Sequence, residues 1–156
     1  MINRGFEIAK GWEDKEINLP VRKTMGAAGY DFEAAEDTIV PSFKKGINPT
    51  LIPTGIKAYM ADDEVLYLYN RSSNPKKKGL ILANSVGVID KDYYNNPDND
   101  GHIMFAFYNV KDEDIMIKKG EAIGQGVFMK YLVTDNDKAE GIRTGGFGST
   151  DKQKKE

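Results

Sequence analysis

Apolar and polar residues alternate at a period of two in several short stretches of the chain. These stretches contain Phe6 and Ile8; Tyr30, Phe32 and Ala34; Val65, Tyr67 and Tyr69; and Ile103, Phe105 and Phe107. Such alternation is typical of half-buried β-strands, because successive side chains of a strand point to opposite faces. A sustained 3.6-residue period is missing, so the pattern disfavours a helical bundle and predicts an all-β barrel or sandwich.

One short helix is expected within residues 73–79. Asn74 suits the capping position, Pro75 the first helical position, and Gly79 the left-handed conformation that ends a helix. The 16 glycines and 6 prolines recur along the whole chain instead of clustering in a linker. This distribution indicates many short elements within one fold.

The 156 residues fit a single ordinary domain. We place a β-barrel at residues 1–132 and a mobile carboxyl-terminal arm at residues 133–156. The arm ends in a wholly polar segment and carries three glycines around a lone aromatic residue, Phe147. Such an arm is either a flexible linker or a loop that closes over a ligand, with Phe147 as a stacking lid.

Charge and composition narrow the chemistry. Because 22 Lys and Arg oppose 24 Asp and Glu, the chain lacks a broad basic field, and we expect no nucleic-acid partner. Cysteine is absent and His102 is the single histidine, which excludes thiolate chemistry and a multi-histidine metal centre within one chain. We interpret His102 as a surface residue without a role.

No apolar run of the sequence approaches the ~20 residues that a membrane span needs. The first residues, MINRGFEIAKGWEDKE, are too charged for the apolar core of a signal peptide. We therefore expect a cytoplasmic protein without membrane contact.

Several polar residues follow predicted strands and could carry chemistry. Arg71, Ser72 and Ser73 lead from a strand into the predicted helix, so they could form a phosphate cradle or simply a solvated strand end. Asp90 ends another strand, and a carboxylate held there could orient and deprotonate a water for in-line attack on phosphorus.

Two further candidates lie within predicted strands. Asp31 could approach a metal ion, and Gln125 could donate a hydrogen bond to a phosphate. Taken singly, each of these candidates also has an ordinary structural interpretation. Asp90 could form a turn, while Asp31 and Gln125 could be exposed strand residues.

Together, five segments in this order resemble the motifs of the homotrimeric dUTP pyrophosphatase (dUTPase) family. They are AAGYDFEAAED (27–37), RSSNPKKKGL (71–80), NSVGVIDKDYY (84–94), KKGEAIGQGVF (118–128) and RTGGFGST (143–150). The resemblance implies a jelly-roll-like β-barrel subunit and a homotrimer with active sites at its subunit interfaces. It also implies Mg²⁺-dependent hydrolysis of dUTP to dUMP and pyrophosphate, which limits uracil in DNA and supplies dUMP for thymidylate synthesis.

The resemblance also implies a role for each matching residue. Asp90 is similar to the carboxylate that activates water, and Tyr93 to the ring under the deoxyribose that leaves no room for a 2′-hydroxyl. Asn84 and the backbone of Val88 and Met104 match a hairpin that pairs with uracil. The remaining matches are phosphate contacts at Arg71, Ser72, Ser73 and Gln125; a water-mediated metal contact at Asp31, with Mg²⁺ held mainly by the phosphates; uracil stacking at Phe147; and distal phosphate contacts at Arg143, Ser149 and Thr150.

Two alternatives remain open. The dCTP deaminase relatives share the Arg-Ser-Ser segment but use a glutamate near the base, and residues 102–109 contain neither Glu nor Asp. The polar insertion at residues 95–100 could instead serve a regulatory protein partner, with the nucleotide site as a switch. From the sequence, this surface loop could border the site or contact another protein.

Overall fold

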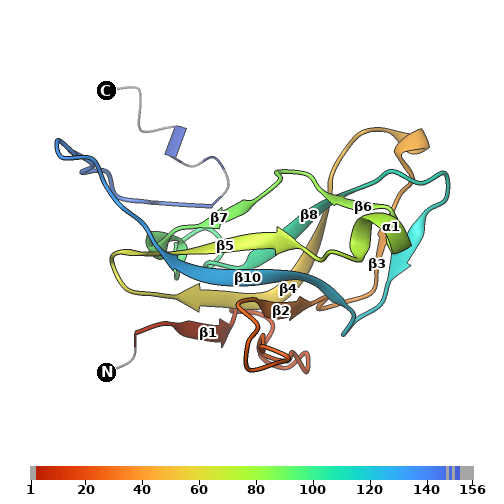
Figure 1. Ribbon diagram of the computed structural model, residues 1–156, viewed down its shortest axis with the longest axis horizontal. Coiled ribbons are helices and arrows are strands. Elements are labelled where there is room, and N and C mark those ends of the chain that lie inside the picture. The colour runs from red at the N-terminus through yellow and green to blue at the C-terminus, as the bar shows by residue number, and fades with distance from the viewer. Residues whose placement is uncertain (1–2, 147, 149, 152–156) are drawn as a thin grey trace.

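Two four-stranded antiparallel sheets form the body of the molecule in the computed structural model, which describes residues 3–146, 148 and 150–151 (Figure 1). The first sheet has the order β1-β4-β8-β6: β1 (Gly5–Ile8), β4 (Thr50–Tyr59), β8 (Ile103–Asn109) and β6 (Leu80–Leu82). The second has the order β2-β10-β5-β7: β2 (Tyr30–Glu33), β10 (Ala122–Lys130), β5 (Glu64–Asn70) and β7 (Gly87–Ile89). The predicted all-β, jelly-roll-like class is confirmed.

Short elements complete the fold. They are the two-stranded sheet of β3 (Thr38–Val40) and β9 (Ile115–Ile117), the α-helix α1 (Asn74–Lys78), and the 3-10 helices η1 (Phe43–Lys45) and η2 (Lys91–Tyr93). Within the described residues, no helix is long and apolar enough to cross a membrane.

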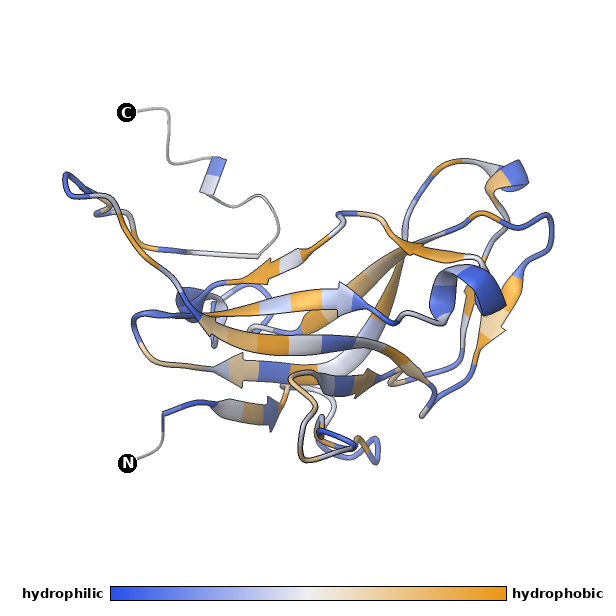
Figure 2. Cartoon of the chain, viewed as in Figure 1, coloured by the Kyte–Doolittle hydropathy of each residue, from blue (hydrophilic) through white to orange (hydrophobic). Residues whose placement is uncertain are grey.

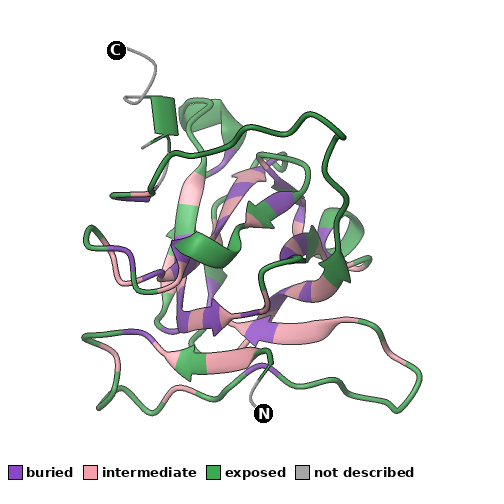
Figure 3. Ribbon diagram, turned by 90° about the vertical axis from the view of Figure 1, so that its left-hand side faces the viewer, coloured by how far each residue is buried: buried purple, intermediate pink, exposed green. Residues whose placement is uncertain are grey.

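The hydrophobic core lies between the two four-stranded sheets. Phe32 of the second sheet packs against Phe105 of the first with ring centroids 5.4 Å apart, and both side chains are fully buried. Apolar residues concentrate on the strands and polar residues on the connections (Figure 2), and the buried residues lie mainly on the strands between the sheets (Figure 3). Burial alternates along β8, as the period of two predicts. Burial of this apolar surface is the main stabilising contribution to the fold.

The inward face of β5 differs from the prediction. The strand forms as expected, but Leu66 and Leu68 enter the core, whereas Tyr67 is partly exposed and Tyr69 is 37% exposed. The stretch VLYLY is apolar at every position, so its pattern fixes a strand without fixing which face is buried.

The helix α1 forms where it was predicted, but its amino-terminal cap was placed one residue too late. Ser73 holds the cap position without a side-chain hydrogen bond, and Asn74 is already helical. Asn74 is fully buried and donates to Asn70 Oδ1 and to the carbonyl of Ile123, because tertiary contacts compete for its side chain. Gly79 ends the helix in the left-handed conformation, as expected.

Close approach of the two sheets explains Gly124. A Cβ atom on this residue would lie 2.2 Å from Cε1 of Phe105, well inside van der Waals contact. The β10–β2 register shifts between Ala122 and Gly124, next to this contact. A larger residue would push the sheets apart or distort the strand.

Gly124→Ala is therefore expected to lower the free energy of unfolding by about 1–3 kcal/mol, the usual effect of overpacking a core. Gly26→Ala is the matched control, since Gly26 is exposed and has no neighbour within 4 Å of an added Cβ. Urea unfolding at one protein concentration measures both variants. Equal stability of the two variants would contradict the close packing at Gly124.

Candidate functional site

A cavity of about 270 Å³ lies beside β7, between the turn that precedes this strand and the carboxyl-terminal segment. Its lining comprises Leu68, Asn84, Gly87, Val88, Ile89, Asp90, Tyr93, Met104, Arg143, Gly146, Gly148 and Thr150. A hollow of about 430 Å³ next to Trp12 and Lys119 contains none of the predicted site residues. The cavity at β7 is therefore the hollow in which one group of the predicted site residues meets.

The backbone of β7 forms one wall of the cavity. Gly87 pairs with Leu68 of β5, and a Cβ on Gly87 would meet the Leu68 side chain at 2.9 Å. Before the strand, Ser85 has a positive φ of 62°, and the Val86 amide donates to the Asn84 carbonyl. This tight turn presents Asn84 at the cavity, where Val88 and Met104 also lie. The structure thus brings together Asn84, Val88 and Met104, the three residues predicted to form hydrogen bonds with a base.

Arg143 joins two carboxylates at the mouth of the cavity. Its Nη2 donates to Asp90 Oδ2 at 2.7 Å, and its Nε donates to Asp92 Oδ1 at 2.8 Å. Burial raises the pKa of Asp90 above its ordinary value, opposed by the charge of Arg143 and assisted by that of Asp92. Asp92 was not singled out from the sequence, although it lies in the same motif.

Tyr93 is buried beneath this ion pair, with 7% of its surface exposed. The Arg143 guanidinium lies 6.0 Å from the centroid of the Tyr93 ring. The hydroxyl of Tyr93 donates to the His102 carbonyl at 2.6 Å and accepts from Asn99 Nδ2 at 2.9 Å. Burial also raises the pKa of Tyr93, so the phenol stays neutral.

The segment after β10 turns back and passes over β7 (Figure 1). The Gly146 amide donates to Asp98 Oδ2 at 3.3 Å, and Thr150 lines the cavity. Phe147 and Ser149 lie outside the described residues. The boundary at residue 132 and the mobility of the arm remain predictions.

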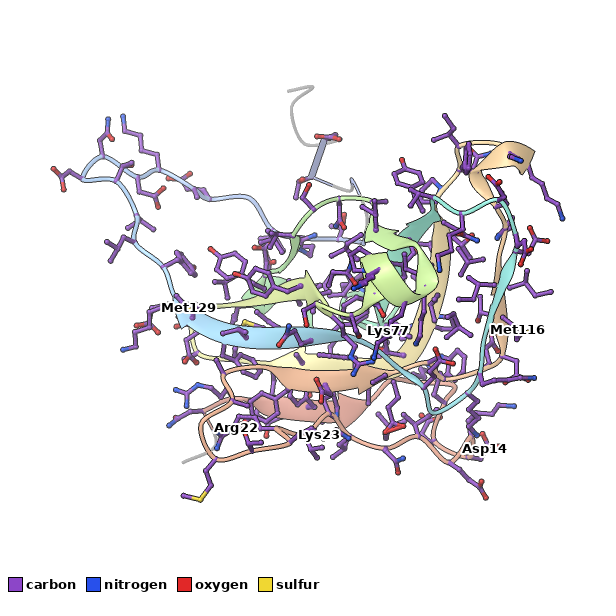
Figure 4. All side chains as sticks on the ribbon, turned by 45° about the vertical axis from the view of Figure 1, so that its right-hand side comes forward. Asp14, Arg22, Lys23, Lys77, Met116 and Met129 are labelled. Atoms are coloured by element: carbon purple, nitrogen blue, oxygen red, sulfur yellow. The ribbon has the colours of Figure 1, made fainter. Side chains whose placement is uncertain are left out.

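A second group of predicted residues lies at another corner of the same sheet. Arg71 Nη1 donates to the Ala122 carbonyl at 3.2 Å, and Gln125 pairs across the sheet with Asp31. Ser72 and Ser73 lead from there into α1. Figure 4 labels Lys77 on α1, the helix that Ser73 precedes, and Met129 near the end of β10.

None of these residues lines the cavity at β7. Ile89, the residue before Asp90, pairs with Leu66, five residues before Arg71 along β5. At the rise of an extended strand, this separation is about 16 Å. A single chain therefore holds the predicted site residues as two separate groups.

His102 differs from its prediction as a surface residue without a role. It is partly buried, its ring lies 5.3 Å from that of Trp12, and its Nε2 accepts a hydrogen bond from the Gly55 amide at 2.9 Å. Burial lowers the pKa of His102, which keeps this acceptor nitrogen free of a proton. A single histidine carries no pattern from which this packing could have been predicted.

The insertion at residues 95–100 lies against Tyr93 and Gly146, two residues that line the cavity. Asn99 Nδ2 donates to the Tyr93 hydroxyl, and Asn96 Nδ2 donates to the Tyr93 carbonyl at 2.8 Å. The run of Asn and Asp predicted a loop, but only the folded chain identifies the partners of these side chains. Binding of a protein partner at this segment remains a prediction.

Among the described residues, no group of three or more His, Asp or Glu could hold a metal ion by itself. Asp31 is a partly exposed single carboxylate on β2. This donor set fits a metal whose ligands come mainly from a bound polyphosphate, with at most an indirect protein contact.

The geometry defines a two-sheet β-protein with a small-ligand cavity at a sheet edge and a carboxylate–arginine cluster at its mouth. The dUTPase family model matches residues 15–151. The chain is 58% identical over 149 residues to the deoxyuridine 5′-triphosphate nucleotidohydrolase of Lactococcus lactis subsp. lactis, covering 94% of this chain and 97% of that protein. The chain belongs to the dUTPase family.

Solved structures agree with this assignment. The crystal structure of dUTPase from Streptococcus mutans aligns with a TM-score of 0.78 at 50% identity, covering 85% of this chain and 99% of that one. The dUTPase of phage phi11 of S. aureus, as its D95N mutant, aligns with a TM-score of 0.66 at 16% identity, covering 90% and 98%. At this low identity, the phage structure supports a similarity of fold alone.

The ion pair predicts a measurable coupling between the arm and Asp90. Arg143→Gln should raise the pKa of Asp90 further, because the variant removes the positive charge that stabilises the carboxylate. Carboxyl ¹³C NMR titration of the ligand-free protein measures this shift, with Lys138→Gln as a charge-matched control on the same segment. An Asp90 pKa that is unchanged or lowered in the Arg143 variant would contradict the contact.

Proposed function

We propose that this chain hydrolyses dUTP to dUMP and pyrophosphate. The observation that carries the proposal is the cavity at β7, which Asn84, Val88, the carboxylate of Asp90 and the buried Tyr93 line together. Membership of the dUTPase family supports the same activity. A cytosolic location, limitation of uracil in DNA and supply of dUMP for thymidylate synthesis belong to this proposal.

The base would bind at the turn before β7. Asn84 and the backbone of Val88 and Met104, which line the cavity, would offer hydrogen bonds that suit uracil and mismatch the donors of cytosine. A shallow wall here would also exclude the methyl group of thymine. The buried ring of Tyr93 would lie under the deoxyribose and exclude a 2′-hydroxyl by steric contact.

Asp90 would act as the general base. The raised pKa of Asp90 supports this role, because a carboxylate becomes a stronger base as its pKa approaches the working pH. Asp90 would take a proton from a water whose oxygen attacks the α-phosphorus. The bond to the bridging oxygen then breaks, and pyrophosphate leaves.

Arg143 would exchange partners when the substrate binds. In the ligand-free chain its guanidinium is held by Asp90 and Asp92, and the phosphates of dUTP would compete for it. If Arg143 moved to a distal phosphate, the carboxylate of Asp90 would be free to accept the proton of the attacking water. Thr150 and Ser149 would add phosphate contacts, and Phe147 would stack over the uracil.

Mg²⁺ would be held mainly by the triphosphate, with Asp31 in contact through water. When bound, the ion would offset the negative charge that the phosphates carry during transfer. The phage phi11 structure describes the coordination of a structural Mg(II) ion in that protein. In this chain, Asp31 would help to position the water shell.

A homotrimer would bring the two groups of site residues together. Arg71, Ser72, Ser73 and Gln125 lie away from the cavity of their own chain, yet all are proposed to contact phosphates. Cyclic symmetry would place this corner of one subunit against the β7 cavity of the next. Each active site would then use residues from more than one copy.

The dCTP deaminase alternative is less well supported. That chemistry needs a glutamate beside the base, and β8, which contributes Met104, contains no acidic residue. The family match likewise favours the pyrophosphatase.

Asp90→Asn is expected to lower turnover of dUTP by roughly 10²–10⁴-fold while nucleotide binding persists, because the variant removes a base and keeps its shape. Pyrophosphate release from dUTP, dCTP, dTTP and UTP, with and without Mg²⁺, measures activity and selectivity. Asp92→Asn is the matched control, since Asp92 shares the Arg143 contact but is not the proposed base. Near-normal turnover by Asp90→Asn would overturn the assignment.

Shared sites predict complementation between inactive subunits. Mixing Asp90→Asn with Arg71→Ala chains by co-refolding should restore activity, because about one quarter of sites in random trimers combine an intact Asp90 with an intact Arg71. Pyrophosphate release from the mixture measures the recovery, and each variant refolded alone is the control. Light scattering that finds a monomer at concentrations that hydrolyse dUTP would refute the trimer.

A further inference from the structure

The insertion at residues 95–100 forms a closed network of hydrogen bonds. Asn96 is 5% exposed, and its Oδ1 accepts from the amides of Asp98 and Asn99. The Oδ1 of Asn99 in turn accepts from Asn96 Nδ2 at 2.7 Å and from the Gly101 amide at 3.1 Å. The loop therefore has a defined shape that its own side chains maintain.

This loop is also anchored to the first sheet. Lys57 of β4 donates to Asn95 Oδ1 at 2.6 Å and to Asp100 Oδ2 at 2.9 Å, and the Lys10 amide donates to the same Asp100 oxygen. The side chain of Lys57 is only 13% exposed. Such anchoring gives the loop a rigid base from which to position other groups.

This network of hydrogen bonds holds Tyr93 in place. The loop contacts Tyr93 at both ends of the residue, through Asn96 at the backbone carbonyl and through Asn99 at the hydroxyl. The hydroxyl also donates to the His102 carbonyl, so it is held from two directions. The ring has no other polar atom by which its tilt could be fixed.

We propose that Asn99 is a positioning residue that fixes the ring of Tyr93 and so sets the discrimination between deoxyribose and ribose. This inference rests on the proposed function. Without the Nδ2 donor, the hydroxyl keeps one bond, and the ring can tilt away from the sugar. The space gained would admit a 2′-hydroxyl, so selectivity would fall more than activity.

The test compares two isosteric Asn→Asp changes within the insertion. Asn99→Asp keeps the oxygen that accepts from Asn96 and Gly101 but loses the donor to Tyr93. Asn95→Asp adds the same charge on an exposed residue whose side-chain oxygen accepts from Lys57, a bond that an aspartate would retain. The readout is the ratio of kcat/KM for dUTP to that for UTP, in which an effect of charge on both triphosphates cancels.

Asn99→Asp should lower this ratio about fivefold, as expected for the loss of one hydrogen bond of ordinary net strength. Asn95→Asp should leave the ratio unchanged. In a Tyr93→Phe background, Asn99→Asp should cause no further loss, because the hydroxyl through which Asn99 acts is already absent.

A wild-type ratio in Asn99→Asp would overturn this inference, and so would an equal loss in the Tyr93→Phe background. In either case, normal dUTP hydrolysis by the wild-type protein would leave the proposed function standing. Failure of the wild-type protein to hydrolyse dUTP would overturn the proposed function and this inference together.

Discussion

The close face-to-face packing of the two sheets is the constraint on which the rest of the structure depends. Phe32 and Phe105 meet between the sheets, and Gly124 leaves the space that the Phe105 ring occupies. A core filled in this way has no room for a ligand, so polar chemistry is confined to edges and connections. The three-residue edge strand β7 and the loops around it provide such a place.

At that edge, burial and the charge of Arg143 have opposite effects on the pKa of Asp90. Asp90 loses hydration beside the cavity, which favours its protonated form, while Arg143 favours the carboxylate. An arginine supplied by the chain's carboxyl-terminal segment thus links the state of the proposed base to the position of the arm. The insertion connects to the same arm through Asp98 and Gly146, so base, tyrosine and arm belong to one contact network.

The separation of the two groups of site residues has a simple geometric cause. Asp90 follows Ile89, which pairs with Leu66 of β5, whereas Arg71 follows the end of β5. Within one chain, about 16 Å of extended strand separates the two positions. The proposed homotrimer would place residues of both groups in one site.

The fold class, the position of α1 with its glycine stop, and the family could be predicted from the sequence, because these depend on local pattern and on ordered motifs. The sequence also grouped Asn84, Val88, Asp90 and Tyr93 within one short segment. Which face of β5 is buried depends on packing against the other sheet, since VLYLY is apolar throughout. The same holds for the bonds of Asn74, His102 and Asn99, whose partners lie on other elements or depend on how a loop closes. Local pattern records which side chains are apolar or polar, but burial and hydrogen bonding are properties of the neighbours that folding supplies.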